Sequence, residues 1–132
     1  MSNAELAGQL LSTARSDLLA LSNMRDPDAF DDRVFGFHAQ RAVEKALKAW
    51  LSALGESPPY THDLSLLLHK LDALGQSVHG CWQFLELTSF AVRFRYEDMP
   101  EDEEPPDRET LTMEIRGLVG RVEAIHDESS RQ

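Results

Sequence analysis

The sequence contains a single cysteine and lacks long hydrophobic runs, and both shortages narrow the class of protein. Cys81 cannot form an intramolecular disulfide or complete a four-ligand zinc site, so we expect it to be a small core or interface residue in a reducing compartment. No segment approaches the roughly 20 apolar residues of a transmembrane helix, and the N-terminal segment lacks the apolar run of a signal peptide. These features predict a soluble cytoplasmic protein without a membrane association.

Basic residues are also scarce. The 132 residues include 13 Lys and Arg against 23 Asp and Glu, giving a formal net charge of −10. Phosphate neutralisation needs clustered Lys and Arg, so this balance argues against a general nucleic-acid binder. Seven of the acids lie within residues 97–107, however, so the rest of the chain is far less acidic and has room for a local basic site.

Apolar residues recur at spacings of three and four, which indicates amphipathic helices, and no segment shows the two-residue alternation of a strand. Short connectors favour antiparallel neighbours, so we predict one all-α domain over residues 1–132, an up-and-down antiparallel bundle of four to five helices. The predicted helices cover residues 5–22, 30–54, 61–74, 78–96 and the segment that follows Asp107.

Local signals place the ends of these helices. Gly55 and Gly75 are expected to end the second and third helices, and Thr61 and Asp107 to cap the third and fifth. Residues 97–106, rich in acids and proline, are predicted to form a solvated, mobile loop because they cannot bury apolar surface.

A first candidate site lies on the second helix. His38, Arg41, Lys45 and Lys48 fall within one sector of that helix, opposite its apolar stripe. This basic ridge could face phosphates. Alternatively, it is a solvated helix face on which Glu44 and Lys48, four residues apart, form a stabilising pair.

A second candidate is Arg93-Phe94-Arg95-Tyr96, at the end of the predicted fourth helix. Arginine binds phosphate oxygens bidentately and tyrosine stacks on bases, which favours a phosphate or nucleotide site. The alternative is structural, because Arg95 could simply pair with nearby acids such as Glu97.

A third candidate is the segment Thr61-His62-Asp63. It is typical of a helix start, and neighbouring side chains on a helix point about 100° apart, so we do not expect His62 and Asp63 to form a proton-transfer pair. The sequence also lacks phosphate-binding glycine loops and the usual hydrolase and metal motifs, so no metal site and no cofactor are predicted.

Three blocks, residues 37–51, 61–64 and 93–98, occur in the order and spacing of the HEPN domain family, which the chain closely resembles. The resemblance implies a small helical bundle, commonly a homodimer, often encoded beside a minimal nucleotidyltransferase partner in a system of toxin–antitoxin type. The residues that match the family's motifs are Gln40, Glu44, Lys45 and Lys48 in the second helix, His62 and Asp63 at the start of the third, and Arg95 and Tyr96.

The chain departs from the family's ribonucleases at their usual motif, an Arg followed after four to six residues by a His. No histidine follows Arg93 or Arg95 at the required distance. Formal matches at residues 33–38 and 121–126 lie within predicted helices, where that offset separates the side chains by about 140°, so we interpret them as coincidence.

These observations favour a non-catalytic binding module. In this hypothesis Arg93, Arg95 and Tyr96, helped by Lys45 and Lys48, hold a nucleotide phosphate, RNA or an acidic partner surface. One alternative is a metal-independent ribonuclease toxin that uses a noncanonical histidine such as His38 or His62. Another is a structural dimerisation or antitoxin module with no small ligand. The acidic segment could also shield the arginines until a partner displaces it.

Overall fold

The computed structural model describes residues 1–87 and 107–131, and all regular structure within these two ranges is helical. The predicted all-α bundle is therefore confirmed. None of the described helices is long and apolar enough to cross a membrane. The elements are α1 (Asn3–Asn23), α2 (Asp32–Ala53), α3 (Leu64–Ala73), the short 3-10 helix η1 (His79–Phe84) and α5 (Arg108–Ser130).

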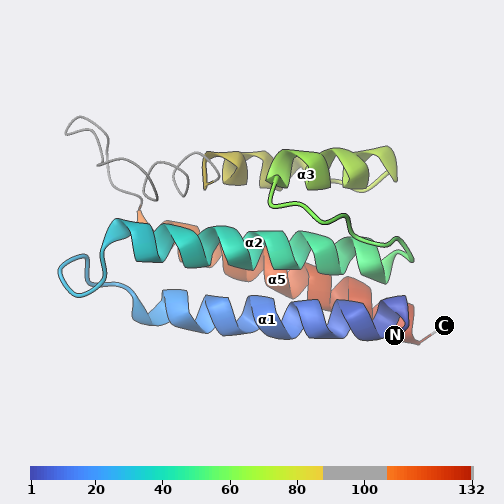
Figure 1. Ribbon diagram of the computed structural model, residues 1–132, viewed down its shortest axis with the longest axis horizontal. Helices are drawn as coiled ribbons and strands as arrows, with labels where there is room; N and C mark the ends of the chain where they lie inside the picture. The colour runs from blue at the N-terminus through green and yellow to red at the C-terminus, as the bar shows by residue number, and fades with distance from the viewer. Residues whose placement is uncertain (88–106, 132) are drawn as a thin grey trace.

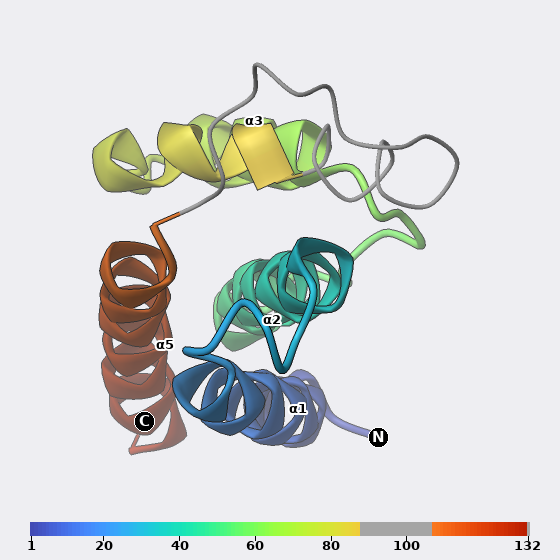
Figure 2. The same cartoon turned by 90° about the vertical axis from the view of Figure 1, so that its left-hand side faces the viewer.

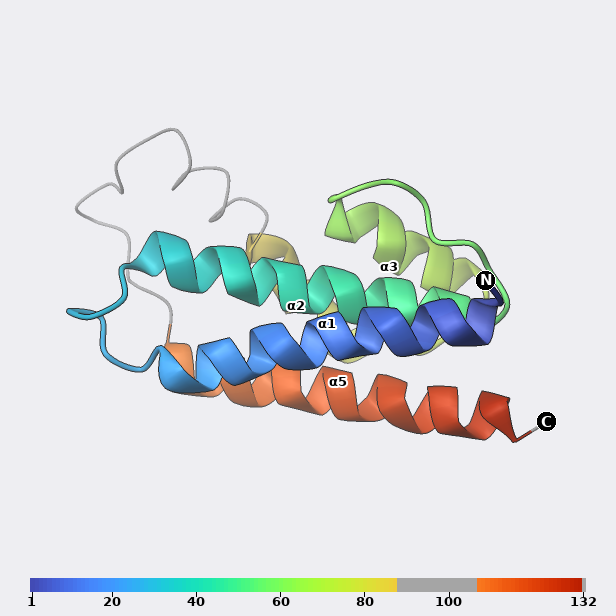
Figure 3. The same cartoon turned by 60° about the horizontal axis from the view of Figure 1, so that its bottom comes forward.

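Helices α1, α2 and α5 pack against one another, and α3 with η1 lies on the side of α2 away from α1 (Figures 1 and 2). Helix α5 runs antiparallel to α1, because His126 near its end contacts the Ala4 carbonyl at 3.0 Å while Arg108 at its start reaches the Met24 carbonyl at 2.9 Å. Figure 3 shows the three long helices side by side. Helix α2 thus lies at the centre of the bundle.

The connector between α2 and α3 doubles back along α2 (Figure 1). The side-chain amide of Gln40 donates to the His62 carbonyl at 3.3 Å, just before α3 begins. Beyond the end of α3, Gln76 accepts from the indole N–H of Trp50 at 3.0 Å. Helix α3 therefore runs in the same direction as α2, whereas the antiparallel order predicted from short connectors describes α1 with α2 and α1 with α5.

Aspartates are the N-caps of α2, α3 and α5. Asp63, and not Thr61 as predicted, is the N-cap of α3, because its carboxylate accepts from the Ser65 amide at 2.9 Å while the Thr61 hydroxyl accepts only from the Asp63 amide. Asp107 caps α5 as predicted, and hydrogen bonds from the Thr110 amide and hydroxyl hold the pKa of Asp107 below its usual value. The third helix thus begins at Leu64, whereas a cap at Thr61 would have started it at His62.

Glycines end two of the helices, as predicted. Gly55 and Gly75 follow α2 and α3 with φ values of 89° and 80°, in the left-handed region that only glycine adopts at little cost. The amide of the residue after each glycine bonds back to a carbonyl in the last turn, so the free carbonyls there are satisfied. These two positions fix where the chain turns away from α2 and from α3.

The predicted fourth helix begins differently from expectation. Its first part is η1, a 3-10 helix, and its predicted continuation over residues 88–96 lies outside the described residues. In a 3-10 helix, residues three apart lie on the same side, and Cys81 and Phe84 are both buried there. The 3-10 helix thus places both side chains in the core.

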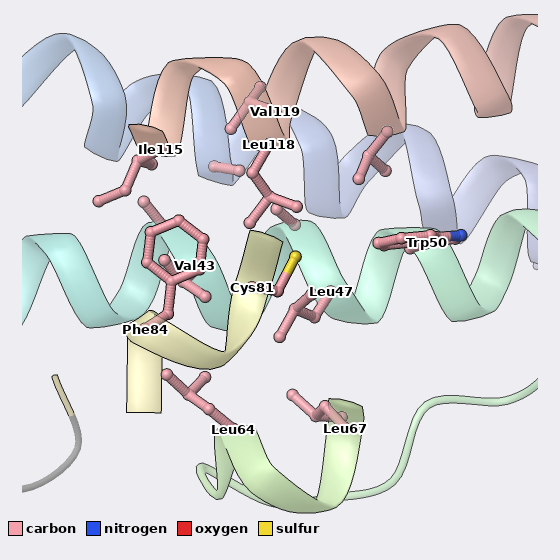
Figure 4. Close-up of a cluster of buried hydrophobic side chains, with 14 of the residues drawn as sticks. Val43, Leu47, Trp50, Leu64, Leu67, Cys81, Phe84, Ile115, Leu118 and Val119 are labelled. Carbon is pink, nitrogen blue, oxygen red and sulfur yellow. The ribbon is translucent and has the colours of Figure 1, made fainter. Parts of the chain in front are cut away.

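The core lies between α1, α2, α3, η1 and α5, and Figure 4 shows part of it. Cys81 is part of it, as predicted, and burial raises the pKa of its thiol, which is therefore protonated at neutral pH. Close packing of this kind holds α2 rigidly in place. The labelled core residues are Val43, Leu47 and Trp50 of α2, Leu64 and Leu67 of α3, Cys81 and Phe84 of η1, and Ile115, Leu118 and Val119 of α5.

A buried arginine ties the start of α2 to α5. The guanidinium of Arg108 donates to the carbonyls of Met24 and Phe30 at 2.9 and 2.7 Å and to the carboxylate of Asp32 at 2.9 Å. It also lies over the ring of Phe35, 5.0 Å from its centroid. Satisfied in this way, the buried charge fixes the α1–α2 connection and the direction in which α2 leaves it.

Candidate functional site

One side of α2 faces away from the core and carries the candidate site. Val34, Phe37, Arg41, Lys45 and Lys48 follow one another at spacings of three and four, which places them in one sector of the helix. We call these five residues the α2 strip. Its first half is apolar and its second half is cationic.

Helix α1 supplies a buried carboxylate on one flank of the strip. Asp17 is buried, with one oxygen 2.9 Å from Nδ1 of His38 and the other 3.2 Å from Nε of Arg41. Removing a carboxylate from water is costly, and two nearby cationic or donor groups offset that cost. Asp17 therefore holds both side chains against α1, while the Arg41 side chain remains 47% exposed.

Glu44 forms a second buried centre on the other flank. Its carboxylate lies 3.2 Å from Nζ of Lys48, 3.6 Å from Nζ of Lys45 and 2.8 Å from Nδ1 of His62. The pair with Lys48, four residues apart, is the one predicted, but Glu44 is buried and not on a solvated face. Because the connector doubles back, His62 reaches a carboxylate on α2 that lies 18 residues away in sequence.

His62 is held by one nitrogen and exposed at the other. Its side chain is 89% exposed although Nδ1 is fixed by the Glu44 carboxylate. With Glu44 ionised, Nδ1 carries the proton of a neutral imidazole, which leaves Nε2 as an acceptor. The arrangement can therefore accept a proton from a molecule bound beside α2.

The charges of the site are arranged by depth. The two acids, Asp17 and Glu44, are buried, whereas Arg41 is half exposed and the Lys45 side chain is 26% exposed. A molecule that approaches the strip therefore meets cations first. This is a locally positive surface on a chain whose formal net charge is −10.

Other residues singled out in the sequence lie at the edge of this site or elsewhere. Besides its bond to the His62 carbonyl, Gln40 has a buried Oε1 that accepts no hydrogen bond from the part of the chain that the structure describes. Asp63 is turned toward its own helix as its cap, in keeping with the expectation that it does not pair with His62. Arg93, Arg95 and Tyr96 lie outside the described residues.

In each of the two formal Arg–His matches, the arginine and the histidine contact different partners. Arg33 pairs with Asp31 at 3.2 Å, whereas His38 contacts Asp17. In the second match, Arg121 stacks on Trp50 at 4.5 Å and donates to the Ser77 carbonyl, whereas His126 contacts the Ala4 carbonyl. In the described ranges, no three His, Cys, Asp or Glu side chains gather in a way that could hold a metal ion.

A comparison with family models decides the family. The model described as HEPN domain matches residues 7–127, which includes the whole of α2 and its strip. The chain belongs to the HEPN domain family. Membership supports a nucleotide- or RNA-related module in general, and HEPN domains commonly dimerise. No curated protein and no solved structure matches the chain at a significant level.

Sequence reasoning on this HEPN domain missed Asp17. A signal was present, because Asp17 lies three residues after Ala14 and four before Leu21, both on the apolar face of α1. An acid on such a face needs partners, and acids are rarely buried without them. The partners, on α2, could not be identified before the packing of α1 on α2 was known.

Proposed function

We propose that this HEPN domain is a non-catalytic binding module for nucleoside phosphates or RNA. The α2 strip supports the proposal, because Arg41 is exposed and Lys45 is partly exposed on a surface whose acids, Asp17 and Glu44, are buried beneath them. Arginine binds phosphate oxygens in a planar, bidentate way and lysine binds them as a compact charge. The acidic remainder of the chain favours a local contact over extended nucleic-acid binding.

Arg93, Arg95 and Tyr96 complete the proposed binding surface. Arg95 and Tyr96 match the family's Arg-Tyr ending in the sequence, and the two arginines add phosphate-binding groups. A tyrosine beside them offers a face on which a base stacks. For these three residues the proposal rests on the sequence alone.

The non-catalytic assignment follows from the missing histidine. RNA cleavage of the family's type uses a histidine to move a proton and an arginine to stabilise the developing charge on phosphorus. No histidine stands at the required distance after Arg93 or Arg95. The expected site then keeps its phosphate-binding group without a group that transfers protons.

We further propose that the domain acts as a homodimer and associates with a minimal nucleotidyltransferase, as the family resemblance implies for a toxin–antitoxin-like pair. A reading frame for such a protein beside the gene, and co-elution of the two purified proteins, would support this pairing. Separate elution of the two proteins at micromolar concentrations would count against it. Light scattering would report whether the domain alone is a dimer.

The binding proposal is tested by a thermal-shift screen against ATP, GTP, their diphosphates and a short single-stranded RNA. A ligand present at 100 times its dissociation constant stabilises the protein by about 2.7 kcal/mol, which raises the melting temperature visibly. We expect a shift for the wild type, a smaller one for Lys45→Gln and Arg95→Ala, and an unchanged one for Lys70→Gln, an exposed lysine on α3.

Each variant is compared with its own ligand-free melting temperature, so that the lost contact between Lys45 and Glu44 does not enter the result. The absence of a shift with every ligand would contradict the proposal and favour a protein partner as the true ligand. If Lys45→Gln and Lys70→Gln reduce the ligand-induced shift equally, the α2 strip is not part of the binding surface.

A second candidate function is metal-independent RNA cleavage that uses His62. The observation that favours it is the hydrogen bond between His62 and the buried Glu44, 2.8 Å long, with the imidazole otherwise exposed. A carboxylate that fixes one imidazole nitrogen sets the tautomer and leaves the other nitrogen to transfer a proton. Lys45 and Lys48, beside the same carboxylate, would then hold the phosphate.

This candidate predicts cleavage of single-stranded RNA in the presence of EDTA. His62→Ala should lower the rate by about 10²- to 10⁴-fold, the usual contribution of a positioned acid or base, whereas His79→Ala, an exposed histidine on η1, should not. Intact RNA after incubation with the wild type, or equal rates for the two variants, would reject it.

A further inference from the structure

Phe37 is an exposed aromatic side chain in the apolar half of the α2 strip, next to Arg41. It is 43% exposed, whereas Phe35 and Phe84 are buried in the core. We propose that Phe37 is the platform on which the base of a bound nucleoside phosphate stacks, with the phosphates on Arg41 and Lys45. The inference rests on the proposed function and adds to it the position and unpaired state of the base.

The ring of Phe37 is braced on one side. It contacts the imidazole of His38 with the two rings 5.4 Å apart and nearly perpendicular, at 81°. His38 is itself fixed by the buried carboxylate of Asp17 at 2.9 Å. This contact limits the rotation of the Phe37 side chain, while the exposed part of its surface remains open to a second planar group.

The spacing of the strip fits a nucleoside phosphate. Phe37, Arg41 and Lys45 are four residues apart in turn, so their Cβ atoms follow one line on the helix at intervals of about 6 Å. A base and its phosphate are separated by a single sugar, which is a span of the same order. One ligand can therefore stack on the ring and place its phosphates beside the two cations.

The charge pattern favours this ligand over an apolar segment of a partner protein. Only Val34 and Phe37 are exposed apolar residues of the strip, which is a small area for a protein interface. An apolar partner would also cover Arg41 and remove its charge from water without supplying an acceptor. A nucleoside phosphate supplies both an aromatic face and oxygen acceptors.

The test compares two ligands that share phosphates but differ in the base. ATP and inorganic tripolyphosphate are titrated calorimetrically into the full chain and into Phe37→Ala, Phe37→Leu, Phe37→Trp and the control Phe30→Ala, an exposed phenylalanine just before α2. Stacking on one aromatic ring predicts that Phe37→Ala and Phe37→Leu weaken ATP binding by about 5- to 150-fold. Tripolyphosphate affinity should not change, and Phe37→Trp should bind ATP like the wild type.

The stacked base could belong to a free nucleotide or to an RNA chain, so a short single-stranded RNA is titrated as well as ATP. Loss of binding of either ligand in Phe37→Ala supports the proposal. Phe37→Leu keeps most of the side-chain volume, so it serves if Phe37→Ala does not fold. Unchanged affinity for both ATP and the RNA in Phe37→Ala and Phe37→Leu, or equal losses for ATP and tripolyphosphate, would overturn the inference and leave the proposed function intact. A wild type that binds none of the ligands would overturn both.

Phe37 could instead contact a second copy of the chain, and light scattering, which measures the oligomeric state, distinguishes this outcome from contact with a base. If Phe37→Ala converts a dimer to a monomer and leaves the affinities for ATP and the RNA unchanged, the ring belongs to self-association and the inference is wrong. If the oligomeric state is the same in wild type and variant while ATP binding falls, the ring contacts the base.

Discussion

At the residue scale, Asp17 and Glu44 determine how the charges of α2 are displayed. Each carboxylate is buried, and each is contacted by two or more cationic or imidazole groups. A buried ion pair adds little net stability over a well-packed apolar pair, but removing one partner strands the other charge. The two acids therefore fix the positions of His38, Arg41 and His62 more than they strengthen the fold.

Glu44 gives the residue-scale prediction. Glu44→Ala strands Lys48, whose side chain is mostly covered, and should lower the free energy of unfolding by about 3 kcal/mol, as breaking a buried pair does. Glu44→Gln keeps an oxygen acceptor and should cost less. Urea denaturation measures both, with Glu128→Ala on the exposed side of α5 as a control that should stay within about 0.5 kcal/mol of wild type. Equal stability of Glu44→Ala and the control would show that the Glu44 contacts do not hold Lys48.

At the element scale, the start of α3 decides where His62 lies. The helix begins at Leu64 with Asp63 as its cap, so His62 stays in the connector and its ring turns toward α2. Had Thr61 been the cap, His62 would have been in the first turn, with its direction set by α3. With Asp63 as the cap, His62 therefore lies outside α3 and contacts Glu44.

The cap is tested by comparing Asp63→Ala with Thr61→Ala. Loss of an N-cap carboxylate costs about 1 kcal/mol, because it leaves amides of the first turn without an acceptor. Thr61→Ala removes only an exposed hydrogen bond and should cost less, and Asp63→Asn should be nearly neutral. Denaturation midpoints measure the difference. A Thr61→Ala loss as large as that of Asp63→Ala would place the cap at Thr61.

The helices themselves could be predicted from sequence, because apolar spacing, caps and glycines act within a few residues of each other. The contacts that build the candidate site could not, since they join distant segments: Asp17 meets His38 across 21 residues and Arg108 meets Met24 across 84. Periodicity indicates which face of a helix is buried, but not which neighbour covers each flank. The 3-10 start of the fourth segment was missed because residues three apart share a face in an α-helix as well, so the spacing of Cys81 and Phe84 does not distinguish the two.

At the scale of the whole molecule, the bundle places two other segments beside the exposed face of α2, one on each flank of the strip. Helix α1 supplies Asp17 on one flank, and the connector that doubles back supplies His62 on the other. Arg108 on α5 fixes the start of α2, so that the strip has a defined direction relative to both. The acids exposed elsewhere on the domain are expected to restrict an anionic ligand to this face.

The phosphate-binding role of the α2 strip is tested most directly by the binding of a labelled short single-stranded RNA and a labelled ATP, followed by fluorescence anisotropy over a series of salt concentrations. If the strip binds phosphates, wild-type binding weakens as salt rises, and Lys45→Gln reduces the slope of log affinity for the RNA against log salt by about 0.7, the contribution of one contact to a single strand. Lys70→Gln should keep the wild-type slope. If neither ligand binds at low salt, or if Lys45→Gln binds RNA with the wild-type affinity and slope, the α2 strip is not a phosphate-binding surface.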